Sequence, residues 1–305
     1  MERTSVLSLP VELLYDIHIH AASPNLPLAC KHLYAVCKSA PTSVHAQYLI
    51  ESYHSARAYS TVADIISLAL RYPVCTQAVL DTIIRSPEYP TLSSENRRKR
   101  TELPRRLFRN LSPRPTSIGK RKRGEPEPSG WTEDDDPLPF LRYLYAHPRI
   151  RTPGADSWEG YALTKAVHAE FIPLVQFLLE HGASPQTKGA LAVMVAIRRK
   201  NLPLVRLLIE RDGPRQTYKR PRMRDEGPGV VTGRDGISAD SARGNDTVTR
   251  DNGAKRRKLG DRVQVNQEMV KTAVQSNARD IVEYFIHEKG CVPDMQTVLL
   301  MGASR

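Results

Sequence analysis

An internal repeat in the second half of the chain constrains its fold more than any other feature. The stretch Ile172–Glu180 (IPLVQFLLE) reappears thirty residues later as LPLVRLLIE at Leu202–Glu210. A third copy contains Ile281–Ile286 (IVEYFI), and a half copy lies at Leu138–Tyr145 (LPFLRYLY). A period of about 30 to 34 residues with two short helices per unit predicts stacked helix pairs, because one pair alone cannot bury its apolar face.

Equivalent positions of the copies carry side chains of similar size. One position is small in all three copies: Ala166, Ala196 and Ala273. We expect two helices to approach closely there, because a larger side chain would not fit. Apolar triplets at 177–179, 207–209 and 284–286 are expected to fill the space between units. A glycine suited to a left-handed helix cap follows each second helix: Gly182, Gly213 and Gly290.

This repeat resembles the ankyrin repeat over residues 137–292, apart from an insertion. Tyr161–Val167 (YALTKAV) stands where that family has Thr-Pro-Leu-His-x-Ala-Ala, and Leu174–Ala183 follows its second-helix pattern. The Thr-Pro and His of the family motif are absent, and the second unit is short. The resemblance implies a partner protein bound through exposed first-helix and hairpin positions. Ordinary amphipathic helices in another helical bundle are the alternative.

The N-terminal segment carries a second resemblance. Leu7–Ile17 (LSLPVELLYDI) is similar to the opening of an F-box, and Leu28–Tyr34 (LACKHLY) is similar to its closing segment. In that family the helices dock on a Skp-type adaptor of a cullin ubiquitin ligase. The resemblance assigns docking and core roles to seven residues: Leu9, Pro10, Leu13, Leu14, Ile17, Cys30 and Leu33.

The segment also departs from the F-box pattern. His18 follows Ile17 where the family usually has an aromatic residue, and Leu33-Tyr34 replaces the closing Trp. The middle is some three residues shorter and contains Pro24 and Pro27. The alternative is a helix pair that merely packs against the helices after it.

Together these patterns predict an all-α fold, in which F-box-like helices precede a short, degenerate ankyrin-type helical solenoid with disordered insertions. Two segments lack periodic apolar residues and cannot offset the entropy lost on ordering. The expected parts are an F-box-like element (1–50), connecting helices (51–96), a disordered basic and acidic linker (97–136), ankyrin-like repeats (137–212), a disordered insertion (213–262), and a final repeat with a tail (263–305).

The net charge of +12 is concentrated between residues 97 and 123. Two basic runs lie in flexible-looking sequence: Lys120, Arg121, Lys122 and Arg123, and Lys255, Arg256, Arg257 and Lys258. Such runs suit capture by a nuclear-import receptor, with a solvated charged loop as the alternative. Nucleic-acid contact would be non-specific and salt-sensitive, since no aromatic residues are interleaved for stacking on bases.

The sequence lacks the signatures of several protein classes. No apolar run reaches the roughly 18 residues of a membrane helix, and no secretory signal pattern is visible, so we expect a nuclear or cytoplasmic protein. No G-x-S-x-G, P-loop, G-x-G-x-x-G or H-E-x-x-H motif occurs, so we assign no catalytic residue, metal or cofactor. The four cysteines form no C-x-x-C pair and are expected as small hydrophobic residues.

The combined arrangement predicts a non-catalytic substrate receptor of a cullin-type, SCF-like ubiquitin ligase. One end would bind the Skp-type adaptor and the repeats would bind a target protein, which raises the local concentration of the target at the ligase. Degenerate ankyrin arrays behind such an element are common in fungal proteins, so we expect a fungal member. The alternative is a nuclear ankyrin scaffold without a ligase, whose N-terminal helices cap the stack.

Overall fold

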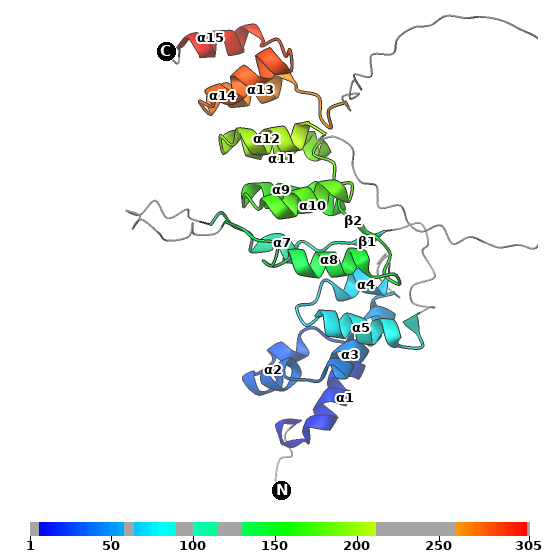
Figure 1. Cartoon of the computed structure of the whole chain (residues 1–305). Coiled ribbons are helices and arrows are strands. Elements are labelled where there is room, and N and C mark those ends of the chain that lie inside the picture. The colour runs from blue at the N-terminus through cyan, green and yellow to red at the C-terminus, as the bar shows by residue number, and fades with distance from the viewer. Residues whose placement is uncertain (1–5, 58–63, 90–99, 115–129, 212–259, 304–305) are drawn as a thin grey trace, which may run out of the picture.

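The computed structural model describes residues 6–57, 64–89, 100–114, 130–211 and 260–303. These residues are mostly helical, with 62% in helices and 2% in strands, which confirms the predicted all-α class. The helices are stacked as successive layers from the N-terminal to the C-terminal end, so the molecule is elongated (Figure 1).

The layers follow the order of the chain. The N-terminal end holds α1 (Val11–Ala21), α2 (Lys31–Lys38) and α3 (Thr42–Arg57), with 3-10 turns at Val6–Ser8 and Leu26–Leu28. Next come α4 (Ile65–Ala69) with α5 (Gln77–Arg85), and α7 (Arg106–Arg109) with α8 (Leu138–Ala146). The repeat pairs are α9 (Ser157–His168) with α10 (Ile172–Glu180), α11 (Thr187–Arg198) with α12 (Leu202–Ile209), and α13 (Gln267–Gln275) with α14 (Arg279–Glu283). A π-helical turn, Tyr284–Glu288, continues α14, and α15 (Met295–Ala303) ends the stack.

Short polar side chains fix where several helices begin. Asp64 accepts the backbone N–H of Ser67 at 2.7 Å, and Asn266 accepts that of Met269 at 2.9 Å. The same capping bond forms at the start of α5 and α12. Each cap satisfies an N–H that the first helical turn leaves without a partner.

The repeat units are equivalent in their packing. The sequence of buried, intermediate and exposed residues is the same, position by position, over 151–167 and 181–197. The small side chain of each unit is completely buried, at 0% exposure: Ala166, Ala196 and Ala273. The expectation of a close helix contact at this position is therefore met in all three units.

The turn inside each unit is also equivalent. The carbonyl of the buried alanine accepts an N–H from the residue five positions later, at 3.0, 3.3 and 3.0 Å in turn: Phe171, Asn201 and Ala278. The residue just before that donor has a left-handed backbone: Glu170 (φ 57°), Lys200 (φ 56°) and Asn277 (φ 53°). This bond closes the first helix and turns the chain into the second.

The turn that opens the first helix of two units is left-handed as well. Trp158, Glu159 and Gly160 have positive φ, and the residues at the same positions of the next unit do too: Lys188, Gly189 and Ala190. At Gly160 a side chain would also collide with the Thr187 hydroxyl of that next unit. Glycine therefore serves both the backbone conformation and the close approach of neighbouring units.

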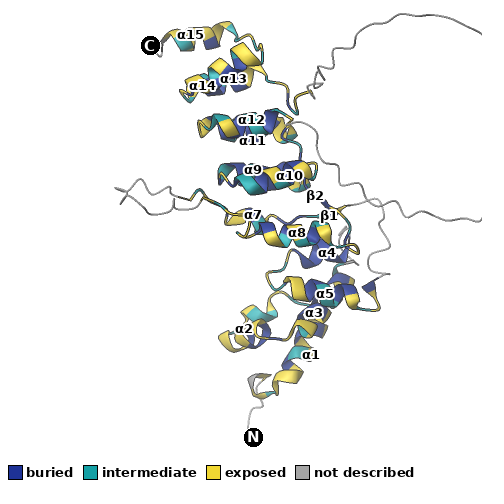
Figure 2. Ribbon diagram, viewed as in Figure 1, coloured by how far each residue is buried: buried dark blue, intermediate teal, exposed yellow. Residues whose placement is uncertain are grey.

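One hydrophobic core runs through the stack, from Ile19 on α1 to Phe285 after α14. Figure 2 shows buried residues along the interior of the successive layers. A second, smaller cluster lies between α1 and α2 and contains Leu14, Leu33 and Val36. The N-terminal pair thus has a core of its own, while α3 belongs to the main core.

The predicted disordered linker 97–136 is wrong for residues 100–114 and 130–136. Thr101–Glu102 (β1) forms a parallel pair with Pro153–Gly154 (β2), and Phe108 on α7 is 1% exposed. Trp131 stacks on Phe171 at 4.7 Å between ring centroids and donates its indole N–H to the Ala169 carbonyl at 2.8 Å. A few apolar residues are enough to order parts of this charged segment, because each packs into a site that the helices form.

The predicted disordered insertion, 213–262, extends too far at its end, because residues 260–262 belong to the fold. The N–H of Arg262 donates to the Ile209 carbonyl at 2.7 Å, so the chain re-enters the stack beside the point where it left. Gly182 and Gly290 have the positive φ expected of helix caps. Gly213 and the rest of the insertion lie outside the described residues.

Substitution of Ala196 tests the close helix contact. Ala196→Leu should lower the free energy of unfolding by about 1–3 kcal/mol, because the larger side chain overpacks a fully buried site. Urea denaturation followed by circular dichroism measures the change. The control Gln176→Leu adds a leucine at an exposed position of α10 and should stay within about 0.5 kcal/mol of the parent. Equal midpoints for Ala196→Leu and the parent would contradict the packing described here.

Candidate functional site

Helix α1 carries exposed apolar side chains at its outer surface. Pro10, Leu13 and Ile17 are spaced by three and four residues, so they lie along one side of the helix. Leu13 is 47% exposed and Ile17 is 38% exposed. We call these three residues the apolar stripe. Figure 2 shows exposed residues on α1 and α2 at the N-terminal end of the stack.

Further exposed apolar residues lie in the same N-terminal segment: Val6, Val11, Leu28 and Tyr34. Isolated exposed apolar residues are common on protein surfaces, but a concentration in one short segment is typical of an interaction site. The N-terminal segment is therefore the first candidate functional surface.

The structure divides the seven predicted docking and core residues into two groups. Leu14 and Leu33 are buried between α1 and α2, and Leu9 and Cys30 pack against them. The remaining three form the apolar stripe. Cys30 begins α2, where its Sγ accepts the N–H of Leu33 at 3.5 Å. The buried group holds the two helices together, and the exposed group is available to a partner.

Histidines lie where α1 meets α3. The ring of His18 stacks on Tyr48 of α3, with 4.1 Å between centroids and 14° between planes. A ring at this position thus packs although the aromatic residue of the F-box pattern is replaced. The Nδ1 atom of His18 is buried and has no hydrogen-bond partner among the described residues. Burial lowers the pKa of His18, and His45 lowers it further. Burial also lowers the pKa of His45, against a hydrogen bond to the backbone of Lys38.

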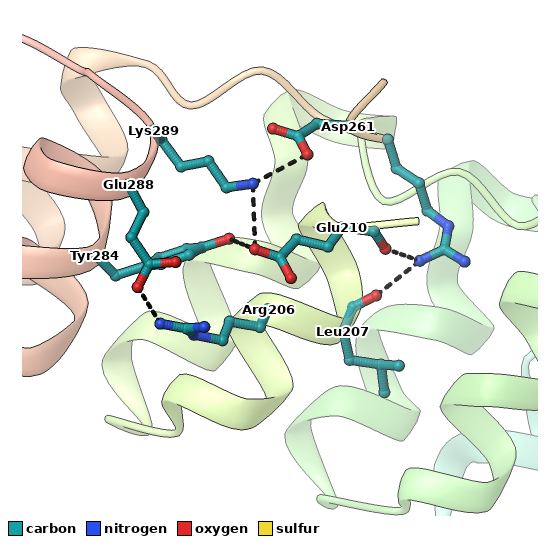
Figure 3. Close-up of polar contacts among 8 residues, drawn as sticks. Arg206, Leu207, Glu210, Asp261, Tyr284, Glu288 and Lys289 are labelled. Carbon is teal, nitrogen blue, oxygen red and sulfur yellow. Dashed lines mark hydrogen bonds and ion pairs between the residues drawn. The ribbon is translucent and has the colours of Figure 1, made fainter. Parts of the chain in front are cut away.

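A polar network joins the last unit to the end of α12 (Figure 3). The Lys289 ammonium lies 3.2 Å from Glu210 and 3.0 Å from Asp261, and the Tyr284 hydroxyl donates to Glu210 at 2.8 Å. Burial opposes the charge of Glu210, but the hydrogen bonds from Tyr284 and Lys289 leave its pKa below the usual value. Arg206 pairs with Glu288 beside them.

The same network holds the returning end of the insertion. The Arg262 guanidinium donates to the Leu207 carbonyl at 2.8 Å and also to the Glu210 carbonyl. This network is not apparent in the sequence, because its members lie on both sides of the insertion and no spacing rule connects them. Its charges compensate one another, so its arrangement suits a structural lock and not a reactive site.

Other candidate chemistry is sparse in the described part of the chain. Burial raises the pKa of the Cys75 thiol to about 12, which keeps it protonated and unreactive at neutral pH. Cys37 is also buried, whereas Cys30 and Cys291 are partly exposed. Within the described ranges, no group of three or more His, Cys, Asp or Glu residues is placed to hold a metal ion.

The two predicted basic runs, at residues 120–123 and 255–258, lie outside the described residues. No helix of the described ranges is both long enough and apolar enough to cross a bilayer. Comparisons with protein-family models, with curated proteins and with solved structures gave no match to this chain.

Acidification should destabilise the contact between α1 and α3. A free histidine has a pKa near 6.5, and the folded pKa of His18 and His45 is lower. As pH falls through about 6.5, the unfolded chain therefore binds protons before the folded chain does, and stability is lost until the lower folded pKa is reached. His18→Phe keeps a ring on Tyr48 and removes one titrating group.

The melting temperature of His18→Phe should therefore fall less than that of the parent between pH 7.5 and pH 5.5, as followed by circular dichroism. His20→Phe, at an exposed position of the same helix, controls for the loss of a histidine as such. A fall as large in His18→Phe as in the parent would exclude His18 as a source of the pH dependence.

Proposed function

We propose that this chain is a non-catalytic substrate receptor of a cullin-type, SCF-like ubiquitin ligase. Its F-box-like helices α1 and α2 bind a Skp-type adaptor, and its ankyrin-like helix pairs bind the target protein. The reaction is accelerated by proximity, because a bound target meets the ubiquitin-charged partner at a high effective concentration. The chain itself supplies no reacting group.

The apolar stripe is the observation that carries this proposal. Leu13 and Ile17 face solvent directly beside Leu14, which is 2% exposed, so α1 has one side for its own core and another for a partner. Covering a leucine or isoleucine side chain completely is worth about 1.5–3 kcal/mol. Two such residues one helical turn apart fit the apolar anchors typical of helix docking.

The attachment of this element to the stack also suits a receptor. Ile19 of α1 belongs to the main core, together with Tyr48 of α3. The docking helices are therefore joined to the repeats by packed side chains. A fixed distance between the two binding ends favours transfer to the target, since effective concentration depends on geometry.

The ankyrin-like solenoid is supported by the equivalence of the units. The matching burial of 151–167 and 181–197, the buried alanines and the shared turn hydrogen bonds indicate one structural unit used repeatedly. Residues 120–123 and 255–258 are our candidates for binding an import receptor, in a protein that acts in the nucleus, the cytoplasm or both.

Binding to a purified Skp-type adaptor tests the proposal. The double variant Leu13→Asp, Ile17→Asp should weaken adaptor binding at least about tenfold, equivalent to about 1.4 kcal/mol, because two carboxylates replace the apolar anchors. Biolayer interferometry measures the dissociation constant. The control Ser43→Asp, Gln47→Asp adds two acids at exposed positions of α3 and should bind as the parent does. If the parent binds no better than the stripe variant, the ligase proposal fails.

A nuclear scaffold without a ligase is the second candidate. It is favoured by the continuity of the core, because α3, α4 and α5 extend the stack beyond the predicted repeats. Removal of residues 1–40, which precede α3, distinguishes the scaffold proposal from the receptor proposal. The scaffold proposal predicts a destabilised or insoluble chain. The receptor proposal predicts a folded stack that no longer binds the adaptor, and its circular dichroism signal falls only by the contribution of α1, α2 and the two 3-10 turns.

A further inference from the structure

Four cationic side chains gather where α9 and α11 end: Lys165, Arg198, Arg199 and Lys200. Arg198, Arg199 and Lys200 are exposed and Lys165 is partly exposed. Among the described residues, no carboxylate forms an ion pair with any of the four. We call them the basic end of α9 and α11.

The two helices lie in neighbouring layers of the stack (Figure 1), and the contacts at their two ends show that they run in the same direction. Near their starts, Lys188 lies 3.5 Å from Glu159. At their ends, the Arg199 guanidinium donates to the His168 carbonyl at 3.2 Å. The four cations therefore lie on one part of the surface although they come from two repeat units.

Partly exposed apolar side chains precede the basic end on both helices. On α11 these are Leu191, Met194 and Val195, which precede Arg198 by seven, four and three residues. On α9 Tyr161 stands four residues before Lys165. Residues with these spacings share one side of a helix. The surface is thus largely apolar toward the starts of the helices, where the Arg105 guanidinium also lies over Tyr161, and cationic at their ends.

The pKa of His168 is sensitive to the electrostatic potential at the basic end. Burial is the largest cause of its lowered pKa, followed by the positive charges of Arg199 and Lys165, which outweigh the opposite effect of Glu170. Its Nδ1 atom is buried without a hydrogen-bond partner among the described residues. The net local charge is therefore positive.

A favourable interaction with the helix macrodipole does not account for the whole cluster. Cations near a helix C-terminus are stabilising by a few tenths of a kcal/mol to about 1 kcal/mol. However, α10 and α13 belong to the same repeat array and have no basic residue in their last turn. The basic end is a property of α9 and α11 and not of the repeat as such.

We propose that α9 and α11 bind an acidic segment of the recruited target, in which several carboxylates stand a few residues from apolar side chains. Leu191 and Arg198 are seven residues apart, which is about 10 Å along a helix. An extended peptide spans that distance in three to four residues. This inference rests on the proposed function and names the chemistry of its target.

A protein segment fits this surface better than a nucleic acid. The acidic residues Asp156 and Glu159 flank the start of α9, and Glu170 follows its end. A phosphate backbone continuing past the start of α9 would meet the carboxylates of Asp156 and Glu159, whereas the carboxylates of a short peptide lie at the basic end. Of the apolar residues named above, Tyr161 alone has an aromatic ring, and the Arg105 guanidinium already lies over it at 5.3 Å. One partly covered ring is not a platform for stacking successive bases.

Selection from a random 16-residue peptide library displayed on phage tests the proposal with the full chain and without any adaptor. The parent should enrich peptides in which carboxylates stand three to four positions from apolar residues, in either order. Arg198→Glu with Arg199→Glu should not enrich them, and a synthetic enriched peptide should bind this variant at least about tenfold more weakly. The control Arg85→Glu with Arg279→Glu changes the charge equally at other exposed positions and should behave as the parent.

Three outcomes would overturn the inference: enriched peptides without acidic residues, equal binding by the charge-reversed variant, or tighter binding of a 20-nucleotide single strand than of any peptide at 150 mM salt. If the charge-reversed chain does not fold, Arg198→Gln with Lys165→Gln replaces it, and unchanged peptide binding by this variant also refutes the proposal. Adaptor binding through the apolar stripe is measured separately, so either proposal can fail while the other stands.

Discussion

The close contact at the buried alanines governs how the stack is built. Ala166, Ala196 and Ala273 occupy a position where only a small side chain fits, and the carbonyl of each accepts the N–H that turns the chain into the second helix. One residue thus sets both the spacing of neighbouring helices and the reversal of the chain. Because this contact is internal, the exposed residues of each unit are free to differ. That freedom allows α9 and α11 to carry a basic end which α13 lacks.

The helices were predictable because their apolar residues recur with a regular period, and the same period identified the buried alanines. Most of the ordered parts of residues 97–136 were not predictable, although the apolar residues Leu107, Phe108 and Leu111 indicate a short turn of helix, which is α7. Thr101 and Trp131 stand among charged and polar neighbours, and the sites that bury them are formed by distant segments. The left-handed turns at Glu170 and Lys200 were hidden for a different reason, since neither residue has the preference of glycine for that conformation.

The candidate docking surface was half predictable. The F-box resemblance assigned docking and core roles to Leu13 and Leu14 without distinguishing them. Adjacent residues on a helix point in directions about 100° apart. Which of them faces the core depends on where α2 packs, and that placement is a tertiary property. His18 illustrates the same limit, because its stack on Tyr48 joins residues that no local pattern connects. The polar network around Glu210 and Lys289 likewise needs the insertion to return beside α12.

The position of Arg262 bears on how this molecule can evolve. Its backbone N–H donates to the Ile209 carbonyl and its guanidinium donates to the Leu207 carbonyl. The chain therefore leaves the stack and returns to it at adjacent points. Because the entropy of loop closure grows only slowly with loop length, residues added or lost between those points should leave the layers above unchanged. We therefore expect a foreign domain inserted at this point to be tolerated. Related chains should vary more in length there than anywhere between α9 and α12.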